Sequence, residues 1–274
     1  MNALDAVKDA ARTLEIAGVP SPRNDAEILV ADVLGTTRSA LYVPDGRLSE
    51  EQVRRLESLL DRRRAREPLA YILGEWGFRR LTLAVDPRVL IPRPETEIVV
   101  ERCLELLRRI GAPRVLDVGT GSGAIALAIA DEHPGARVCA VDKSEDALAV
   151  ARANAERTGL RHRIRLLPGD LLAWIDEPYD LVVSNPPYVE PDEFARLQPE
   201  IREWEPQGAL VGRGIGEELA RDARQALKPG GSLVLECGDG QAPALAAELS
   251  RLGYEGVRTT RDLAGKERVV EGRL

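Results

Sequence analysis

The 274-residue sequence has few residues of the kinds that bind metals, form disulfides or span membranes. Its three cysteines, Cys103, Cys139 and Cys237, are far apart and lie in apolar surroundings, so we expect reduced core residues of a cytosolic protein. Only two histidines are present, from which no zinc site can be assembled, and a metal-dependent mechanism is not expected. No apolar run is long enough for a transmembrane helix.

An excess of basic charge and a secretory leader are also lacking. The formal net charge is −7, which does not predict a broad nucleic-acid surface. The first residues lack the basic start and long apolar stretch of a signal peptide, so we expect a cytoplasmic protein without a membrane partner. The hydrophobic fraction of 44% and the charged fraction of 30% are typical of globular proteins, and the length allows one large or two modest domains.

Residues 1–73 are expected to form a small all-α bundle. Apolar residues recur at helical spacing in three stretches, of which Gly18 and Gly35 end the first two and Ser49 offers an N-cap for the third. The third stretch ends in a basic run that we expect to be a solvated last turn, where positive charge suits the helix dipole. The basic residues are Arg62, Arg63, Arg64 and Arg66.

Residues 74–92 alternate in hydrophobicity and predict a β-hairpin linker. Beyond residue 93, helices alternate with strands, which predicts a parallel sheet with helices on both faces. The link between the last two strands is too short for a crossover, so the last strand should be antiparallel. The expected strands are 115–118, 137–141, 164–167, 179–184, 232–237, 254–259 and 267–272. The expected helices of this part are 94–110, 122–132, 145–157, 217–227 and 242–252.

The tetrapeptide Asn185-Pro186-Pro187-Tyr188 follows one of these strands directly. Two prolines must end the strand because neither can donate to a ladder, and they make the turn stiff. In such sheets ligands bind beyond the carboxyl ends of the strands. The Asn185 oxygen and the Pro186 carbonyl can each accept a hydrogen bond from a planar NH2 group, on which Tyr188 can stack. Unless the turn only caps a buried strand, Asn185, Pro186 and Tyr188 are the predicted catalytic residues, because they would orient the attacking nitrogen and stabilise its growing positive charge.

A glycine-rich turn at residues 117–123 lies between the first strand of the sheet and its helix. Its glycines let the backbone approach a ligand, and with Ala124 they also fit the dinucleotide pattern G-x-G-x-x-G/A. Asp142 ends the next strand and could accept from both ribose hydroxyls in either case. The Asn-Pro-Pro-Tyr turn and the antiparallel end of the sheet favour S-adenosylmethionine over a nicotinamide cofactor. Asp170 could contact an adenine edge or cap a helix.

These segments together resemble the bacterial release factor glutamine methyltransferases, the HemK/PrmC type, over nearly the whole chain. The resemblance lies in residues 21–27, 91–97, 117–123, 184–189, 205–212 and 262–269. It implies that S-adenosylmethionine is the cofactor, bound by Gly119, Thr120, Gly121, Ser122, Gly123, Asp142, Leu171 and Asn185. It also implies that the substrate glutamine is held by Asn185, Pro186, Pro187 and Tyr188.

The resemblance further implies a seven-stranded Rossmann-like methyltransferase sheet in residues 93–274, with residues 1–73 as a helical substrate-recognition domain. The implied reaction methylates the side-chain amide nitrogen (N5) of the glutamine in the Gly-Gly-Gln motif of class I peptide chain release factors, with no direct nucleic-acid contact. Alternatives are a ribosomal-protein glutamine methyltransferase, an adenine-N6 DNA methyltransferase and a non-catalytic nucleotide-binding module. The acidic net charge disfavours DNA, and the helical domain with its linker favours release factors. Arg93 is either a charged linker residue or a contact to cofactor or substrate.

Overall fold

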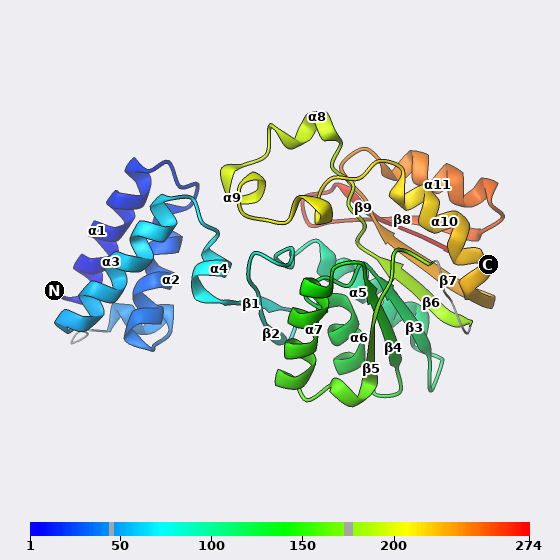
Figure 1. Ribbon diagram of the computed structural model, residues 1–274, viewed down its shortest axis with the longest axis horizontal. Helices are drawn as coiled ribbons and strands as arrows, with labels where there is room; N and C mark the ends of the chain where they lie inside the picture. Colours follow the sequence, from blue (N-terminus) through cyan, green and yellow to red (C-terminus); the bar gives the residue numbers. More distant parts are fainter. Residues whose placement is uncertain (44–46, 173–177) are drawn as a thin grey trace. The chain divides into compact units, whose positions relative to one another are not determined.

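A computed structural model describes residues 1–43, 47–172 and 178–274, which form two compact units. The first unit comprises residues 1–74 together with 198–204, and the second comprises 75–197 and 205–274. Figure 1 labels the elements of both units. Among the described residues, no helix combines the length and the apolar character needed to cross a membrane.

The first unit is helical, as expected from its apolar spacing. Ser49 and Gln52 form a capping box at the start of the third helix, and Gly35 ends the second helix in the left-handed conformation. Leu14 and Leu29 are fully buried where the first two helices pack together. The elements are α1 (Ala3–Ile16), α2 (Pro22–Leu34), the 3-10 helix η1 (Arg38–Tyr42), α3 (Glu50–Arg64), α4 (Leu69–Leu73) and α9 (Pro199–Arg202).

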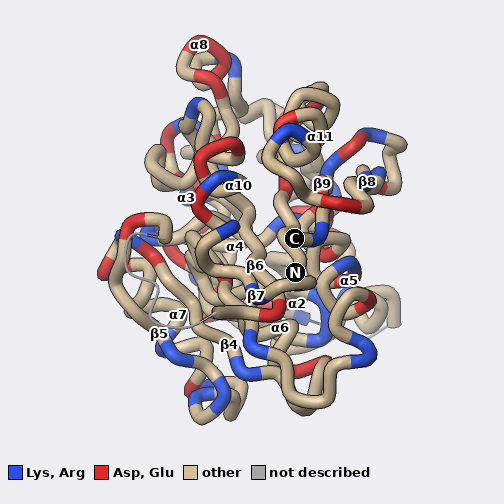
Figure 2. Tube along the Cα trace, turned by 90° about the vertical axis from the view of Figure 1, so that its right-hand side faces the viewer, with Lys and Arg blue, Asp and Glu red and all other residues tan. Residues whose placement is uncertain are grey.

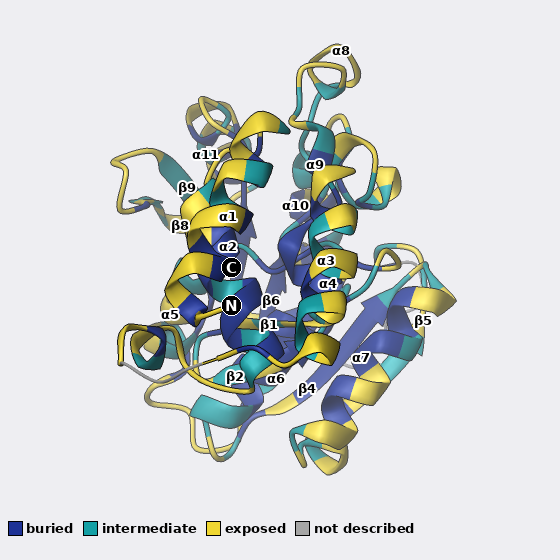
Figure 3. Ribbon diagram, turned by 90° about the vertical axis from the view of Figure 1, so that its left-hand side faces the viewer, coloured by how far each residue is buried: buried dark blue, intermediate teal, exposed yellow. Residues whose placement is uncertain are grey.

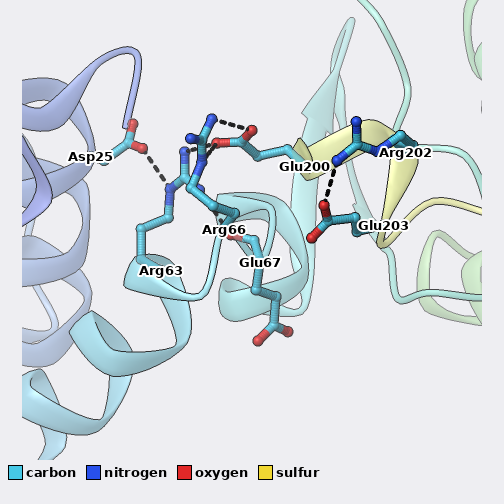
Figure 4. A network of polar contacts seen from close by, with 7 residues as sticks. All are labelled: Asp25, Arg63, Arg66, Glu67, Glu200, Arg202 and Glu203. Atoms are coloured by element: carbon cyan, nitrogen blue, oxygen red, sulfur yellow. Dashed lines mark hydrogen bonds and ion pairs between the residues drawn. The ribbon is translucent and has the colours of Figure 1, made fainter. Parts of the chain in front are cut away.

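The basic end of α3 is not the solvated turn expected from the sequence. Arg63 is only 4% exposed, and it donates to Asp25 Oδ2 at 2.8 Å and to Glu200 Oε1 at 2.9 Å. Arg66 donates to both Glu200 oxygens, at 2.7 and 2.6 Å (Figure 4). The expectation was wrong because residues 198–204, distant in sequence, belong to this unit and supply a carboxylate. Arg64 does remain exposed.

The second unit contains a seven-stranded sheet in the order β5-β4-β3-β6-β7-β9-β8, and the predicted fold class is confirmed. The last strand, β9, is antiparallel to both of its neighbours, while the pairs from β5 to β7 are parallel. The strands are β3 (Arg114–Val118), β4 (Arg137–Asp142), β5 (Ile164–Pro168), β6 (Tyr179–Ser184), β7 (Leu227–Glu236), β8 (Glu255–Arg261) and β9 (Glu267–Arg273). A separate hairpin pairs β1 (Glu75–Phe78) with β2 (Leu81–Ala84).

Helices cover both faces of this sheet because alternate strand residues point to opposite sides. Val115 and Val183 face one hydrophobic cluster, whereas Leu116 and Val182 face the other. The first cluster includes residues of α5 (Thr96–Leu107), α6 (Ala124–Glu132) and α7 (Glu145–Arg157). The second includes residues of α10 (Ile215–Ala226) and α11 (Ala242–Arg251). Figure 3 shows the buried strands between helices whose outer faces are exposed. All three cysteines are buried, as expected of core residues.

Among the element boundaries that differ from the sequence prediction, two have a clear local cause. The helix expected from residue 122 begins at Ala124, because Gly123 adopts a left-handed conformation with φ of 84° before it. The strand expected from residue 232 begins at Leu227, because its first residues pair across a bulge with the start of β6. Lys228 in this bulge holds both oxygens of Asp180, at 2.9 and 2.8 Å. In the second unit, short helices not expected from the sequence are α8 (Pro191–Phe194), η2 (Arg161–Arg163) and η3 (Gln207–Ala209).

Candidate active site

A cavity of about 470 Å³ lies in the second unit, at the carboxyl ends of β3, β4, β5 and β6. This is where ligands bind in open α/β sheets. The predicted site residues on its wall are Gly119, Gly121, Asp142, Leu171, Asn185 and Pro187. Thr120, Ser122 and Gly123 do not line it; Thr120 and Ser122 are buried, and Gly123 caps α6. Pro186 and Tyr188, together with Pro187, line a second cavity of about 260 Å³.

The glycine-rich turn is curled over the end of β4 by main-chain hydrogen bonds. The amides of Gly119 and Thr120 both donate to the Val141 carbonyl at 2.9 Å. Gly119 and Gly121 have φ of 71° and 56°, a left-handed conformation that side chains disfavour. The Thr120 hydroxyl donates to the buried carboxyl of Asp117 at 2.6 Å, and this hydrogen bond holds the turn against the end of β3. The turn therefore presents backbone to the cavity, as a ligand-binding turn requires.

Asp142 holds the neighbouring turns together at the end of β4. Its Oδ2 accepts from the Gly121 amide at 2.8 Å, and its Oδ1 accepts from the Ser144 amide at 2.9 Å. Each carboxylate oxygen has further acceptor capacity, which could serve the two hydroxyls of a ribose. Its main-chain carbonyl accepts from the Gly169 amide at 3.1 Å, where the chain leaves β5.

The turn after β5 brings Asp170 and Leu171 to the same cavity. Leu171 has φ of 48°, an uncommon conformation for a residue with a side chain, so its backbone is held in a specific position there. Asp170 lies where it could contact an adenine edge. Whether it caps a helix concerns residues 173–177, which lie outside the described residues.

The cavity fits S-adenosylmethionine in its size and in the chemistry of its walls. The exposed backbone at Gly119 and Gly121 and the carboxylate of Asp142 suit the polar parts of that molecule, while Leu90, Leu171 and Ile215 offer apolar contact to a flat ring. A concave site that combines apolar walls with a few fixed polar groups is typical of cofactor binding.

The Asn-Pro-Pro-Tyr turn is fixed from several sides. The Asn185 Nδ2 donates to the hydroxyl of Thr96 at 3.1 Å, and the Gln241 side chain donates to the Tyr188 carbonyl at 3.0 Å. Gly212 approaches the turn so closely that a Cβ there would lie 2.5 Å from the Pro187 carbonyl oxygen. A side chain at position 212 would therefore displace the turn.

The Tyr188 hydroxyl donates to Oε1 of Glu236 at 3.3 Å. Burial, and next the negative charge of Glu236, raise the pKa of Tyr188 well above its ordinary value, so that the hydroxyl remains protonated. Burial also raises the pKa of Glu236, to about 7. Perturbed carboxyl groups of this kind are common at functional sites.

Three buried polar residues near the site were not predicted from the sequence. Thr96 is the first residue of α5, Glu236 is the last residue of β7, and Asn154 on α7 joins the hairpin to the glycine-rich turn. The Asn154 side chain donates to the carbonyls of Ala84 and Ser122 at 3.0 and 2.9 Å. Glu236 ends a strand just as Asp142 does, so its position was a usable signal. The position of Asn154 gave no such signal, because this residue lies within a helix.

Arg93, for which the sequence left two roles open, forms an ion pair with Glu205. Glu205 is buried, and burial raises its pKa although the charge of Arg93 opposes the shift. It also accepts from the Ile91 amide at 3.4 Å. The pair therefore joins two of the segments that carry the resemblance, residues 91–97 and 205–212, inside the second unit.

Comparison with known proteins identifies both parts of the chain. Residues 5–74 match the family described as PrmC N-terminal domain, and residues 97–201 match the Methyltransferase small domain. A methyltransferase structure from Pyrococcus furiosus is 21% identical, with a TM-score of 0.51 over 70% of this chain and 87% of that chain, and it shows the fold alone.

Curated relatives match over almost their full length. A release factor glutamine methyltransferase from Deinococcus radiodurans is 43% identical over 100% of this chain and 99% of that protein. The protein of the same name from Geobacter sulfurreducens is 43% identical over 94% of this chain and 91% of its own. These matches confirm a methyltransferase, with S-adenosylmethionine as its cofactor, and the chain belongs to the release factor glutamine methyltransferase family.

Proposed function

We propose that this protein transfers a methyl group from S-adenosylmethionine to the side-chain amide nitrogen of the glutamine in the Gly-Gly-Gln motif of class I peptide chain release factors. Relatives with this name, similar over nearly the full chain, support the substrate. The observation that carries the chemistry is the Asn-Pro-Pro-Tyr turn. Its Asn185 borders the cavity at the end of β6 and directs its amide NH2 toward Thr96.

Two acceptors of this turn suit a primary amide. Among the described residues, neither the Asn185 Oδ1 nor the Pro186 carbonyl accepts a hydrogen bond. Each can accept one N–H of the glutamine side chain, so that the nitrogen is held in one orientation. Bound S-adenosylmethionine supplies an electrophilic methyl group on a sulfonium.

The same acceptors help with the weak nucleophilicity of an amide nitrogen, whose lone pair is delocalised. Oxygens that face its two N–H groups favour the form with a localised lone pair and stabilise the positive charge that grows during attack. Fixed positioning contributes a large part of the rate as well. No strong base is required, because the methylated nitrogen loses its proton late, to water.

We propose that residues 1–73 bind the release factor, supported by their match to the PrmC N-terminal domain. A DNA substrate is less consistent with the chain. Its net charge is −7, and basic and acidic residues are interspersed along it (Figure 2).

The test is methyl transfer from labelled S-adenosylmethionine to a purified class I release factor. We expect label on the intact factor and none on a factor whose Gly-Gly-Gln glutamine is replaced by alanine. Label that persists on the changed factor contradicts the proposal. The variant Asn185→Ala should lower turnover by roughly a hundredfold or more, because it removes one of the two positioning acceptors.

A further inference from the structure

A buried carboxyl group lies behind the Asn-Pro-Pro-Tyr turn. Glu236 is 1% exposed, and among the described residues its Oε2 has no hydrogen-bond partner. Its Oε1 accepts from Tyr188 at the end of the turn, and the Thr96 hydroxyl stabilises the charge of the same carboxyl group. Because Thr96 accepts from Asn185 at the start of the turn, one carboxyl group interacts with residues at both ends of it.

The direction of these hydrogen bonds follows from the chemistry of a hydroxyl group. Thr96 has one proton to donate and two lone pairs with which to accept. An ionised Glu236 can only accept, so the Thr96 proton points to Glu236 and a lone pair points to Asn185. The Asn185 amide must then offer its NH2 to Thr96, and its oxygen is directed away.

We propose that Glu236 and Thr96 are positioning residues, which fix the Asn185 amide so that its oxygen, and not its NH2, meets the nitrogen to be methylated. The inference rests on the proposed function, in which Asn185 accepts from a substrate amide. A flipped Asn185 would present N–H donors to the N–H donors of the substrate. That arrangement loses a hydrogen bond and opposes the positive charge that grows on the nitrogen.

The charged and titratable groups around Glu236 come from three elements. They are Tyr188 of the turn, Glu95 before α5 and Arg268 on β9, with Cys237 next in the chain. Burial raises the pKa of Glu236 to about 7, against the hydrogen bonds of Thr96 and Tyr188; Glu95 adds to the rise and Arg268 opposes it. Protonated Glu236 can donate to Thr96, whose own proton can then favour a flipped Asn185. We therefore expect turnover to fall as the pH drops through about 7.

The experiment compares Thr96→Val, Thr96→Ser, Glu236→Gln and Asp117→Asn with the wild type. For each, kcat and KM for the release factor are measured across pH, and the Kd for S-adenosylmethionine is measured separately. Thr96→Val keeps the shape but lacks the hydroxyl, so kcat should fall roughly tenfold to a hundredfold, as when an orienting partner is lost. Cofactor affinity should stay within about twofold, and Thr96→Ser should restore most of kcat.

Glu236→Gln is nearly isosteric and cannot titrate, so its acid limb near pH 7 should disappear along with part of kcat. Burial also raises the pKa of Asp117 to about 7, so this second buried acid could in principle cause the same pH dependence. The Asp117→Asn variant tests this, and we expect it to keep the acid limb. Wild-type kcat in Thr96→Val, equal losses in Thr96→Ser and Thr96→Val, or an acid limb that persists in Glu236→Gln would each overturn the inference. A wild type that transfers no methyl group to the glutamine overturns the proposed function instead.

Discussion

The helical unit and the carboxyl edge of the sheet bury acidic side chains in opposite ways. In the helical unit, Asp25, Glu27 and Glu200 are buried, and each forms an ion pair with at least one arginine. At the sheet edge, Asp117 and Glu236 are more deeply buried, yet neither forms an ion pair among the described residues. Each of the two has one oxygen without a hydrogen-bond partner there.

The pKa values follow this difference. Hydrogen bonds from Tyr42 and then Arg38 lower the pKa of Glu27 to about 2, although burial opposes them. Burial raises the pKa of Asp117 and of Glu236 to about 7. Glu27 thus keeps a fixed charge and holds segments together, whereas Asp117 and Glu236 can change charge near neutrality. A group that can change its charge near neutral pH can take part in catalysis, but its burial lowers the free energy of unfolding when it ionises.

The largest effect is expected from breaking the helical network at Arg63. Among the described residues, Arg63→Met leaves Asp25 with no cation and Glu200 with only Arg66, so the unit should lose about 3 to 5 kcal/mol of unfolding free energy. Hydrogen exchange of the α1–α3 amides measures this locally. The neighbouring Arg64→Met, which removes an exposed side chain, should cost less than about 1 kcal/mol.

Asp25→Asn in the Arg63→Met background sharpens this test. If the loss comes from an unpaired buried charge, neutralising Asp25 should recover part of it. Equal protection from exchange in the Arg63→Met and Arg64→Met variants would instead show that the buried network contributes nothing beyond an exposed ion pair. The contrast between the two regions would then fail.

An intermediate effect is expected at the sheet edge from Asp117→Asn. The pKa of Asp117 is higher in the folded than in the unfolded state, so its contribution to stability falls as the pH rises from about 4 to about 7. Asparagine at position 117 cannot ionise, so the variant does not lose stability in this way as the pH rises. The stability of the variant relative to the wild type should therefore improve by about 1 to 3 kcal/mol over that range.

Urea unfolding at a series of pH values, followed by hydrogen exchange of the β3 and β6 amides, measures this difference in the second unit. A constant difference between variant and wild type across pH 4 to 7 is incompatible with a proton on buried Asp117. Glu236 should contribute with the same sign, since burial raises its pKa as well.

The sequence predicted the parts of the site that depend on neighbours along the chain. Asn185 and Asp142 were predicted because each stands where an apolar strand ends, and the glycine-rich turn because its spacing is local. Glu236 meets the same criterion and was overlooked. Its contacts with Thr96 and Tyr188 require β7 to lie beside β6, with the start of α5 against both, and no local pattern encodes that packing.

Arg63 shows the same limit in the helical unit. A basic residue in the last turn of a helix is normally solvated and stabilises the helix dipole, so its burial could not be expected from α3 alone. The carboxylate to which Arg63 donates belongs to Glu200, in the distant segment of residues 198–204. Local rules therefore predicted the elements and the strand-end residues, but not the buried polar contacts made between distant segments.

The smallest effect is expected from Tyr42→Phe, which tests what sets the charge of Glu27. The Tyr42 hydroxyl donates to Oε1 of Glu27 at 2.6 Å, and it is the largest cause of the lowered pKa. Its loss should raise that pKa from about 2 toward the ordinary value, and lower stability at neutral pH by about 1 kcal/mol. Because the pKa is lowered in the folded state, the stabilisation is present above about pH 4.5 and disappears as the pH falls through about 2.

Carboxyl chemical shifts in an NMR titration report the pKa of Glu27 directly. Arg23→Met, which removes a longer contact of 3.1 Å from a mostly exposed side chain, should raise it less. If Arg23→Met raises it more than Tyr42→Phe does, cationic charge and not the hydroxyl governs Glu27.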